Sequence, residues 1–295
     1  MGKSKSGGTR GFIRGRIAND VYSIGKDGKG KKQQVIRSLA ESVANPRTTA
    51  QMRGRMIMST VMQAVAGLSA IIDHSFDGVP KGQPSISEFI RRNYALVKAD
   101  EAANPDSGNS FGLNKYGEKA LHAGAYVISD GKKSMPAGWD TIAQYNSIEI
   151  ELGEQAPTFG DLKAAFAEPG VEYLTVVGIK SGKALYARLQ LNSNMADSTA
   201  LTSENIASAF WVEGNTTPQI MLNGSTTKHV NIDLSDGQGS NVDAMGAVCS
   251  FPVDGGYEHN PATLVLIAQN PQYQSIEALP TYPTGSENYL NGGEI

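Results

Sequence analysis

The stretch that decides the fold begins at Asn45 and reads NPRTTAQMRGRMIMSTVMQAVAGLSAII through Ile72. Asn45 is a good helix N-cap, and Pro46 suits the first helical position, where no backbone N–H is needed. Apolar residues then recur at steps of three or four, the period of an amphipathic helix. The pattern predicts one long helix over 46–72, about 40 Å in length at ~1.5 Å per residue.

One side of this predicted helix is rich in methionine and in small residues. Methionine adapts to irregular surfaces, and small residues let another helix approach closely. Two interpretations stay open, because a helix of this length seldom buries itself fully inside one small domain. It is either an ordinary core helix or a helix at a subunit interface, with candidate contact residues Met52, Met56, Met58, Val61, Met62, Val65 and Leu68.

A turn rich in glycine and proline, DGVPKG at 77–82, leads into a second helical pattern. Ser85 and Glu88 have the spacing of a capping box, which predicts that this helix starts at Ser85. Its apolar face is then formed by Ile86, Phe89, Ile90, Tyr94 and Val97.

The N-terminal end of the chain is basic and rich in strand patterns. Residues 1–10 have the composition of a flexible arm, and two strand-like runs over 12–39 flank Asp27-Gly28, a hairpin signal. Clustered cations on an arm and a hairpin tip suit phosphate groups or an acidic protein surface. The candidate residues for contact with a polyanion or a partner are Lys3, Lys5, Arg10, Arg14, Arg16, Lys26, Lys29, Lys31, Lys32 and Arg37.

Charge is divided unevenly along the chain. Residues 1–100 hold 17 Lys and Arg against 7 Asp and Glu, whereas the other 195 residues hold 9 against 22. One end can therefore face a polyanion or the acidic end of a neighbouring molecule.

Short strand patterns separated by Gly, Asn and Ser turns dominate from Ala125 onward, and they predict an antiparallel sandwich or barrel. The expected fold class is α+β. We expect a basic β-hairpin and two-helix domain at 1–98, a linker at 99–124, a β-rich domain at 125–270 and an extended C-terminal arm at 271–295.

Motifs for catalysis are missing from the sequence. The four histidines, His74, His122, His229 and His259, show no metal-ligand spacing, and we expect each to lie at the surface or to be satisfied inside the fold. The single cysteine, Cys249, excludes an internal disulfide. The Gly/Asp-rich stretch from Asp233 to Asp243 departs from a calcium loop. We expect no catalytic residue, no cofactor and no metal, hence a protein that is not an enzyme.

The first third of the chain resembles a known family. The motifs are GFIRGRI at 11–17, VYSI at 21–24, QVIRS at 34–38, VANPRT at 43–48, QMRGRM at 51–56 and FDG at 76–78. Together they resemble an uncharacterised family encoded by crAss-like bacteriophages and by mobile elements of Bacteroidota, and the match covers residues 10–95. The resemblance implies a phage or prophage context and a small, abundant, non-enzymatic protein.

Three functional hypotheses follow. The first is a structural protein of a bacteriophage particle: a capsid-associated, connector or tail component that forms homo-oligomers and contacts other virion proteins. It would be made in the bacterial cytoplasm and located in the virion. No stretch of 18 apolar residues occurs, and we expect no membrane partner.

The second hypothesis is a non-sequence-specific nucleic-acid-binding protein that uses the basic arm and hairpin, with packaged DNA as its partner. The third is a carbohydrate-binding β-domain, with Tyr257, Trp211 and Trp139 as sugar platforms.

Overall fold

The computed structural model describes residues 3–4, 13–17, 20–26, 28, 30–38, 49–103, 111, 121–142, 147–153, 155–167, 169–234 and 242–267. The chain forms two compact units, Met1–Arg47 and Thr48–Ile295. We call them the N-terminal unit and the main unit, and describe each by itself.

The N-terminal unit is one antiparallel sheet of four strands in sequence order. The strands are β1 (Lys3–Ser4), β2 (Ile13–Ile17), β3 (Asp20–Lys26) and β4 (Lys32–Ser38). The predicted hairpin is present, because β3 and β4 pair without interruption from Asp20 opposite Ser38 to Lys26 opposite Lys32.

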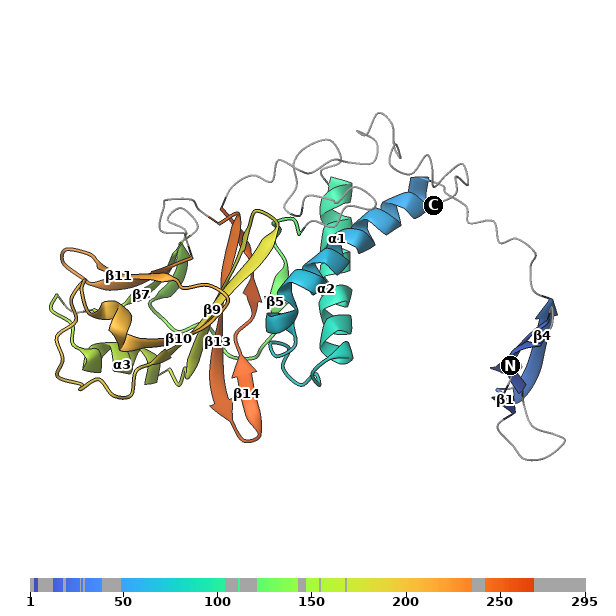
Figure 1. Ribbon diagram of the computed structural model, residues 1–295, viewed down its shortest axis with the longest axis horizontal. Coiled ribbons are helices and arrows are strands. Elements are labelled where there is room, and N and C mark those ends of the chain that lie inside the picture. The colour runs from blue at the N-terminus through green and yellow to red at the C-terminus, as the bar shows by residue number, and fades with distance from the viewer. Residues whose placement is uncertain are drawn as a thin grey trace. The chain divides into compact units, whose positions relative to one another are not determined.

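The main unit has three layers: a helix pair, a six-stranded sheet and a four-stranded sheet (Figure 1). The helices are α1 (Thr49–Ile72) and α2 (Gln83–Ala103). The six-stranded sheet runs β10 (Phe210–Gly214), β9 (Lys183–Leu191), β8 (Tyr173–Lys180), β13 (Ala244–Val253) and β14 (Gly256–His259), with β16 (Val265–Leu266) also beside β13. The four-stranded sheet runs β11 (Gln219–Asn223), β12 (His229–Asp233), β7 (Ser147–Glu151) and β6 (Trp139–Ile142).

Three smaller elements complete the main unit. They are α3 (Phe159–Ala167), the short 3-10 helix η2 (Ile206–Ala209) and a two-stranded pair of β5 (Val127–Ser129) with β15 (Ala262–Thr263). The predicted α+β class is confirmed, and the paired strands of the main unit are antiparallel.

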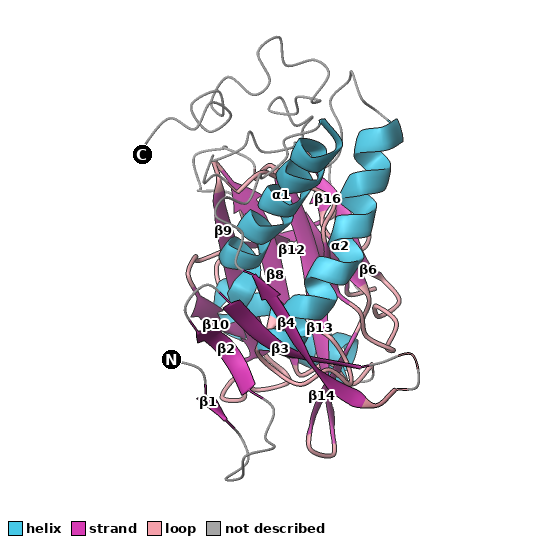
Figure 2. Cartoon of the chain, turned by 90° about the vertical axis from the view of Figure 1, so that its right-hand side faces the viewer, coloured by secondary structure: helices cyan, strands magenta, loops and turns pink. Residues whose placement is uncertain are grey.

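Strand β13 shows why the six-stranded sheet is the middle layer of the main unit. Its residues alternate between two cores: Val248 packs on the helix side, and Met245 and Cys249 pack on the side of the other sheet. A strand buried on both faces reads as a continuous apolar run, as AMGAVCSF at 244–251 does. The view from the helix side shows α1 and α2 side by side over this sheet (Figure 2).

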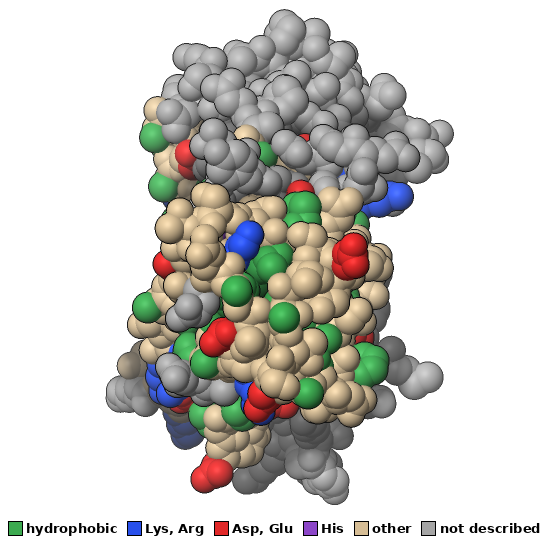
Figure 3. Space-filling view, turned by 90° about the vertical axis from the view of Figure 1, so that its left-hand side faces the viewer, with side chains coloured by type: hydrophobic (Ala, Val, Ile, Leu, Met, Phe, Trp, Pro, Cys, Tyr) green, Lys and Arg blue, Asp and Glu red, His purple; other side chains and the backbone are tan. Residues whose placement is uncertain are grey.

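The core on the side of the four-stranded sheet contains residues of both sheets and of α3. Ile148 and Ile150 of β7 meet Phe166 of α3, whose ring lies 4.6 Å from that of Trp139, centroid to centroid. Two sheets that pack across a shared core form a sandwich, one of the two arrangements that the sequence left open. On the side of the molecule to the left in Figure 1, apolar side chains form small groups between polar ones (Figure 3).

The domain boundary lies elsewhere than the sequence predicted. Phe89 and Val97 of α2 share one core with Tyr126 and with Val177 and Val248 of the sheet, so the helices belong to the β-rich unit. The physical reason is that the apolar faces of two helices exceed what the pair can cover alone.

The expected linker and arm are described only in part. Residues 99–103 continue α2, and residues 121–124 are buried, so these ends of the expected linker belong to the fold. Residues 104–110 and 112–120 lie outside the described residues, as does the expected arm at 271–295.

The predicted capping box at the start of α2 is wrong. The helix starts at Gln83, with Pro84 in its first turn, where proline is tolerated. Ser85 Oγ donates to the carbonyl oxygen of Pro80 at 3.0 Å, while Glu88 accepts from Arg91 and Arg92. The predicted apolar face is confirmed, since its residues line the helix-side core.

Helix α1 ends at Ile72, as the pattern predicts, while its predicted start at 45–46 lies outside the described residues. Among the described helices, the stretch Arg53–Ile72 is long and apolar enough to cross a membrane by length and composition alone, with mean hydropathy 1.5. Half of that stretch is buried inside the main unit, where its apolar side chains form part of the core.

Candidate functional site

The N-terminal sheet has no core of its own among the described side chains, since none of them is buried. Tyr22 lies opposite Ile36 and therefore shares one face with Ile36 and Ile24. Ile36 is 58% exposed and Val35, on the other face, is 36% exposed. This sheet presents apolar side chains that the described part of its own unit leaves uncovered.

The structure describes three of the ten candidate cations fully. Lys31, Lys32 and Arg37 are exposed at and along β4. Lys32 lies opposite Lys26, so the hairpin end carries adjacent positive residues. Strand backbones are described for Lys3, Arg14, Arg16 and Lys26 without their side chains, and Lys5, Arg10 and Lys29 lie outside the described residues.

The predicted subunit interface on α1 is wrong for four of its residues. Met56, Val61, Val65 and Leu68 are buried in the helix-side core, because this face of α1 packs inside its own chain. Met58 and Met62, one turn apart, remain 40% and 43% exposed. The side chain of Met52 lies outside the described residues.

The proposed sugar platforms do not gather at one place. Trp139 is buried between the sheets. Trp211 on β10 and Tyr257 on β14 are exposed, but these strands lie at opposite ends of the six-stranded sheet. The arrangement does not support a carbohydrate-binding cluster of these three residues.

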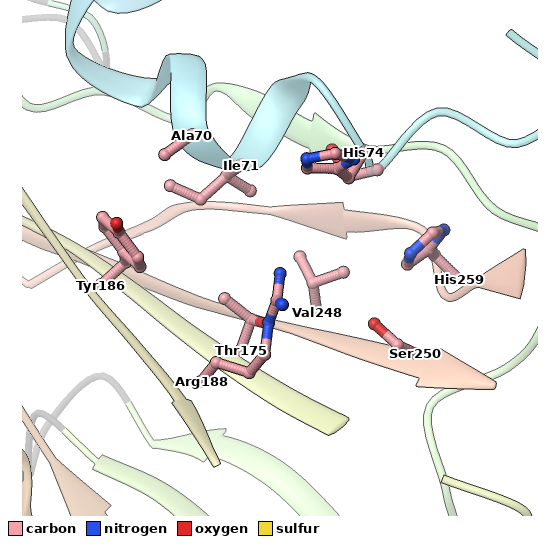
Figure 4. Close-up of a pocket in the computed structure, with 10 residues that line it drawn as sticks. Ala70, Ile71, His74, Thr175, Tyr186, Arg188, Val248, Ser250 and His259 are labelled. Atoms are coloured by element: carbon pink, nitrogen blue, oxygen red, sulfur yellow. The ribbon is translucent and has the colours of Figure 1, made fainter. Parts of the chain in front are cut away.

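A pocket of about 500 Å³ lies between the turn that follows α1 and the end of the six-stranded sheet. A smaller recess of about 40 Å³ adjoins it under the end of α1. Four residues line both: His74, Arg188, Ser250 and His259. Figure 4 shows Arg188, Ser250 and His259 pointing from the strands into the space beside His74.

A buried pair, Asp77 and His259, forms one wall of this pocket. Oδ1 of Asp77 accepts from Nδ1 of His259 at 2.8 Å, and the two side chains are only 6% and 9% exposed. Oδ2 of Asp77 accepts the backbone N–H groups of His259 and Lys132, both at 3.1 Å. Three donors therefore satisfy this carboxylate, and Nε2 is the ring nitrogen that His259 retains for other contacts.

Ser250 completes a serine, histidine and aspartate set without the contact that acyl-transfer chemistry needs. Ser250 lies directly opposite His259 on the neighbouring strand, so both side chains are on one face of the sheet. Among the described residues, no hydrogen bond joins Ser250 Oγ to His259. The nucleophile-to-base contact is therefore missing, and the geometry does not support a catalytic triad.

His74 shares the pocket with two cations, Lys81 and Arg188, and its Nε2 lies 3.9 Å from Asp73 Oδ2. Desolvation lowers the pKa of His74, and the nearby charges of Lys81, Arg188 and His259 lower it further, against the opposing effect of Asp73. The imidazole is therefore held in its neutral form more strongly than an exposed histidine would be.

Sequence reasoning did not find this pocket. Asp77 and His259 are 182 positions apart, and Arg188 and Ser250 come from two further strands. No local spacing links these residues, and only the pairing of β14 with β13 beside the α1–α2 turn brings them together. The positions of the four histidines in the sequence give no sign that His74 and His259 share a cavity.

Metal ligands are not grouped in the described part of the chain, where no three His, Cys, Asp or Glu residues stand close enough to hold an ion. Most of the Gly/Asp-rich loop between Asp233 and Asp243 lies outside the described residues.

Comparisons of the chain with protein-family models, with curated proteins and with solved structures give no match. The family resemblance over residues 10–95 therefore stays a prediction, and a functional proposal rests on the geometry above.

Proposed function

We propose that the protein is a non-enzymatic structural component of a bacteriophage particle, and that it self-assembles by docking its N-terminal sheet onto a neighbouring copy. The observation that carries the proposal is the absence of a buried residue among the described side chains of this sheet, together with the exposure of Ile36. The phage context comes from the family resemblance.

Stability is the first reason to expect a docking partner. Small sheets need a packed apolar face, because a two-stranded hairpin alone is marginal in water and a sheet of three or more strands still needs a hydrophobic face or a helix packed against it. Burying one isoleucine side chain contributes roughly 1.5–3 kcal/mol. Covering Ile36, Ile24 and Tyr22 against a second molecule would supply the core that the described part of the unit lacks.

The edge of the sheet is the second reason. In the described strand order, β4 comes last, so one side of its backbone has no neighbouring strand in this sheet. Edge strands offer unpaired N–H and C=O groups and readily accept a strand from another molecule.

Charge favours a second copy of this chain as the occupant. Residues 1–47 hold 11 Lys and Arg against 3 Asp and Glu, whereas residues 48–295 hold 15 against 26. The N-terminal unit of one copy and the main unit of the next therefore attract each other, and salt weakens this attraction.

The test is the molar mass of the full chain in solution by light scattering, at low and at high salt. We expect a defined oligomer or a salt-sensitive polymer. The double variant Val35→Thr with Ile36→Thr keeps β-branched side chains but removes apolar surface, and should dissociate the assembly. The matched control replaces two exposed valines of the main unit, Val253→Thr with Val265→Thr, and should leave the mass unchanged.

A monomer at every salt concentration would overturn the proposal. Equal loss of mass in the control variant would also count against it, because the docking surface would then not be the N-terminal sheet.

Contact with packaged DNA is a second candidate role, favoured by the exposure of Lys31, Lys32 and Arg37. Such binding would weaken steeply as salt rises, in proportion to the number of phosphates contacted. Gel-shift titrations of the full chain with double-stranded DNA at several salt concentrations test it. Binding that does not change with salt would exclude phosphate contact by these residues.

A further inference from the structure

We propose that the pocket between the α1–α2 turn and the six-stranded sheet binds a small anion that carries a phosphate or carboxylate group. This inference is independent of the assembly proposal, because every residue that lines the pocket belongs to the main unit.

The carboxylates at the pocket are already engaged inside the fold. Asp77 accepts from His259 and from two backbone N–H groups. Asp73 accepts the backbone N–H of Gly82, which closes the turn between α1 and α2. The second oxygen of Asp73, Oδ2, lies 3.9 Å from His74 Nε2, so the partners of both carboxylates in the described residues are histidines and backbone N–H groups, and not Arg188 or Lys81.

The two cations that line the pocket, Arg188 and Lys81, differ from these carboxylates in their contacts. Arg188 lies over the ring of Tyr173, with its guanidinium carbon 5.5 Å from the ring centroid. Within the part of the chain that the structure describes, no carboxylate forms an ion pair with Arg188 or with Lys81. Stacking holds the guanidinium plane in place while its N–H groups stay available, which suits bidentate binding of phosphate or carboxylate.

Two further features fit an anion. Lys81 and Arg188 both line the pocket together with His74, and the charge of each lowers the pKa of His74, against the opposing effect of Asp73. Ser250 lines the same region, and its hydroxyl can donate to an oxygen atom. At about 500 Å³ the cavity is within the size range of small-molecule sites.

The experiment is isothermal titration of the full chain with inorganic phosphate and, separately, with citrate. We expect saturable binding of at least one of them, with one site per chain. Preference for phosphate would identify a phosphorylated ligand class, and preference for citrate would identify a carboxylated one. Either preference supports the site, provided that it depends on the pocket cations.

Variants of Arg188 and Lys81 test whether anion binding depends on the pocket cations. Arg188→Gln should weaken binding about tenfold or more, since a charge-assisted pair is lost. Lys81→Gln, at an exposed position, should weaken binding to a smaller extent without affecting folding. The controls are Arg91→Gln and Lys98→Gln on α2, which do not line the pocket and should bind as the unaltered protein does.

Two results would overturn the proposal. One is the absence of saturable binding of either anion. The other is binding that is equally strong in Arg188→Gln, Lys81→Gln and the two controls. Thermal unfolding of each variant, followed by circular dichroism, shows that Arg188→Gln is folded when its binding is measured.

Discussion

The side-chain amide of Asn93 pairs with the backbone of Val127 as a neighbouring strand would. Asn93 Oδ1 accepts the N–H of Val127 at 2.9 Å, and Asn93 Nδ2 donates to the Val127 carbonyl oxygen at 3.0 Å. Asn93 is fully buried, and Nδ2 also donates to the carbonyl of Phe89. One residue of α2 thus ties the helix pair to β5, in addition to the apolar core that the helices share with the six-stranded sheet.

Replacing Asn93 should destabilise the main unit. Asn93→Ala leaves both backbone groups of Val127 without these partners, and we expect a loss of about 2–3 kcal/mol in the free energy of unfolding. Urea denaturation of the variant measures it. The control is Asn223→Ala at an exposed strand end, which should change stability by less than about 0.5 kcal/mol. An equal effect of both changes would contradict the role of Asn93.

Gly131 allows a close approach between two backbone segments. A Cβ atom at this position would lie 1.7 Å from the carbonyl oxygen of His259. Gly131→Ala should therefore push β14 away and lower stability by roughly 2 kcal/mol or more. In Gly256→Ala the new Cβ has open space, so its denaturation midpoint should stay near that of the unaltered protein. If Gly131→Ala is as stable as the unaltered protein, the backbones at Gly131 and His259 are not this close in solution.

Cys249 should be chemically inert in the folded protein. Burial raises the pKa of its thiol to about 12, so only about one molecule in ten thousand carries a thiolate at pH 8. Reaction with a chromogenic disulfide reagent should be very slow in buffer and complete in denaturant. Rapid labelling without denaturant would mean that this part of β13 opens readily.

Glu88 should contribute to stability at neutral pH and lose that contribution in acid. Hydrogen bonds from Arg91 and Arg92, together with the charges of both, lower the pKa of Glu88 from the ordinary 4.5 to about 2, against the opposing effect of burial. A lowered pKa in the folded state stabilises the fold above pH 4.5, and this gain disappears as the pH falls towards 2. Because the pair lies at the surface, we expect only about 0.5–1 kcal/mol.

The comparison of Glu88→Gln with the unaltered protein measures this contribution. Their difference in unfolding free energy should be larger at pH 6 than at pH 3, while Glu204→Gln, at an exposed position, should show no such trend. A difference for Glu88→Gln that is the same at both pH values would contradict the assignment.

Local patterns predicted much of the fold. The period of α1, the hairpin of β3 and β4, and the short strands of the main unit follow from residues close in sequence. The domain boundary does not follow from residues close in sequence, because it depends on which surfaces the apolar faces of α1 and α2 cover. Asn93 shows the difficulty: its sequence context is an ordinary helix, and its partner lies 34 positions away.

The candidate sites were predicted unequally for the same reason. The basic hairpin could be recognised because its cations are close together in the sequence, whereas Asp77, Arg188 and His259 converge only in three dimensions. The helix-interface prediction failed because amphipathic period marks a face that needs covering without showing whether the same chain covers it.

Hydrogen exchange of the β4 amides, measured by mass spectrometry at increasing protein concentration, tests the central proposal most directly. If the N-terminal sheet docks onto a neighbouring copy, peptides spanning Lys32–Ser38 should exchange rapidly in dilute protein and become protected as the oligomer forms. The Val35→Thr and Ile36→Thr double variant should lose this protection. Rapid exchange of β4 at every concentration, in a sample that light scattering shows to be oligomeric, would contradict the account.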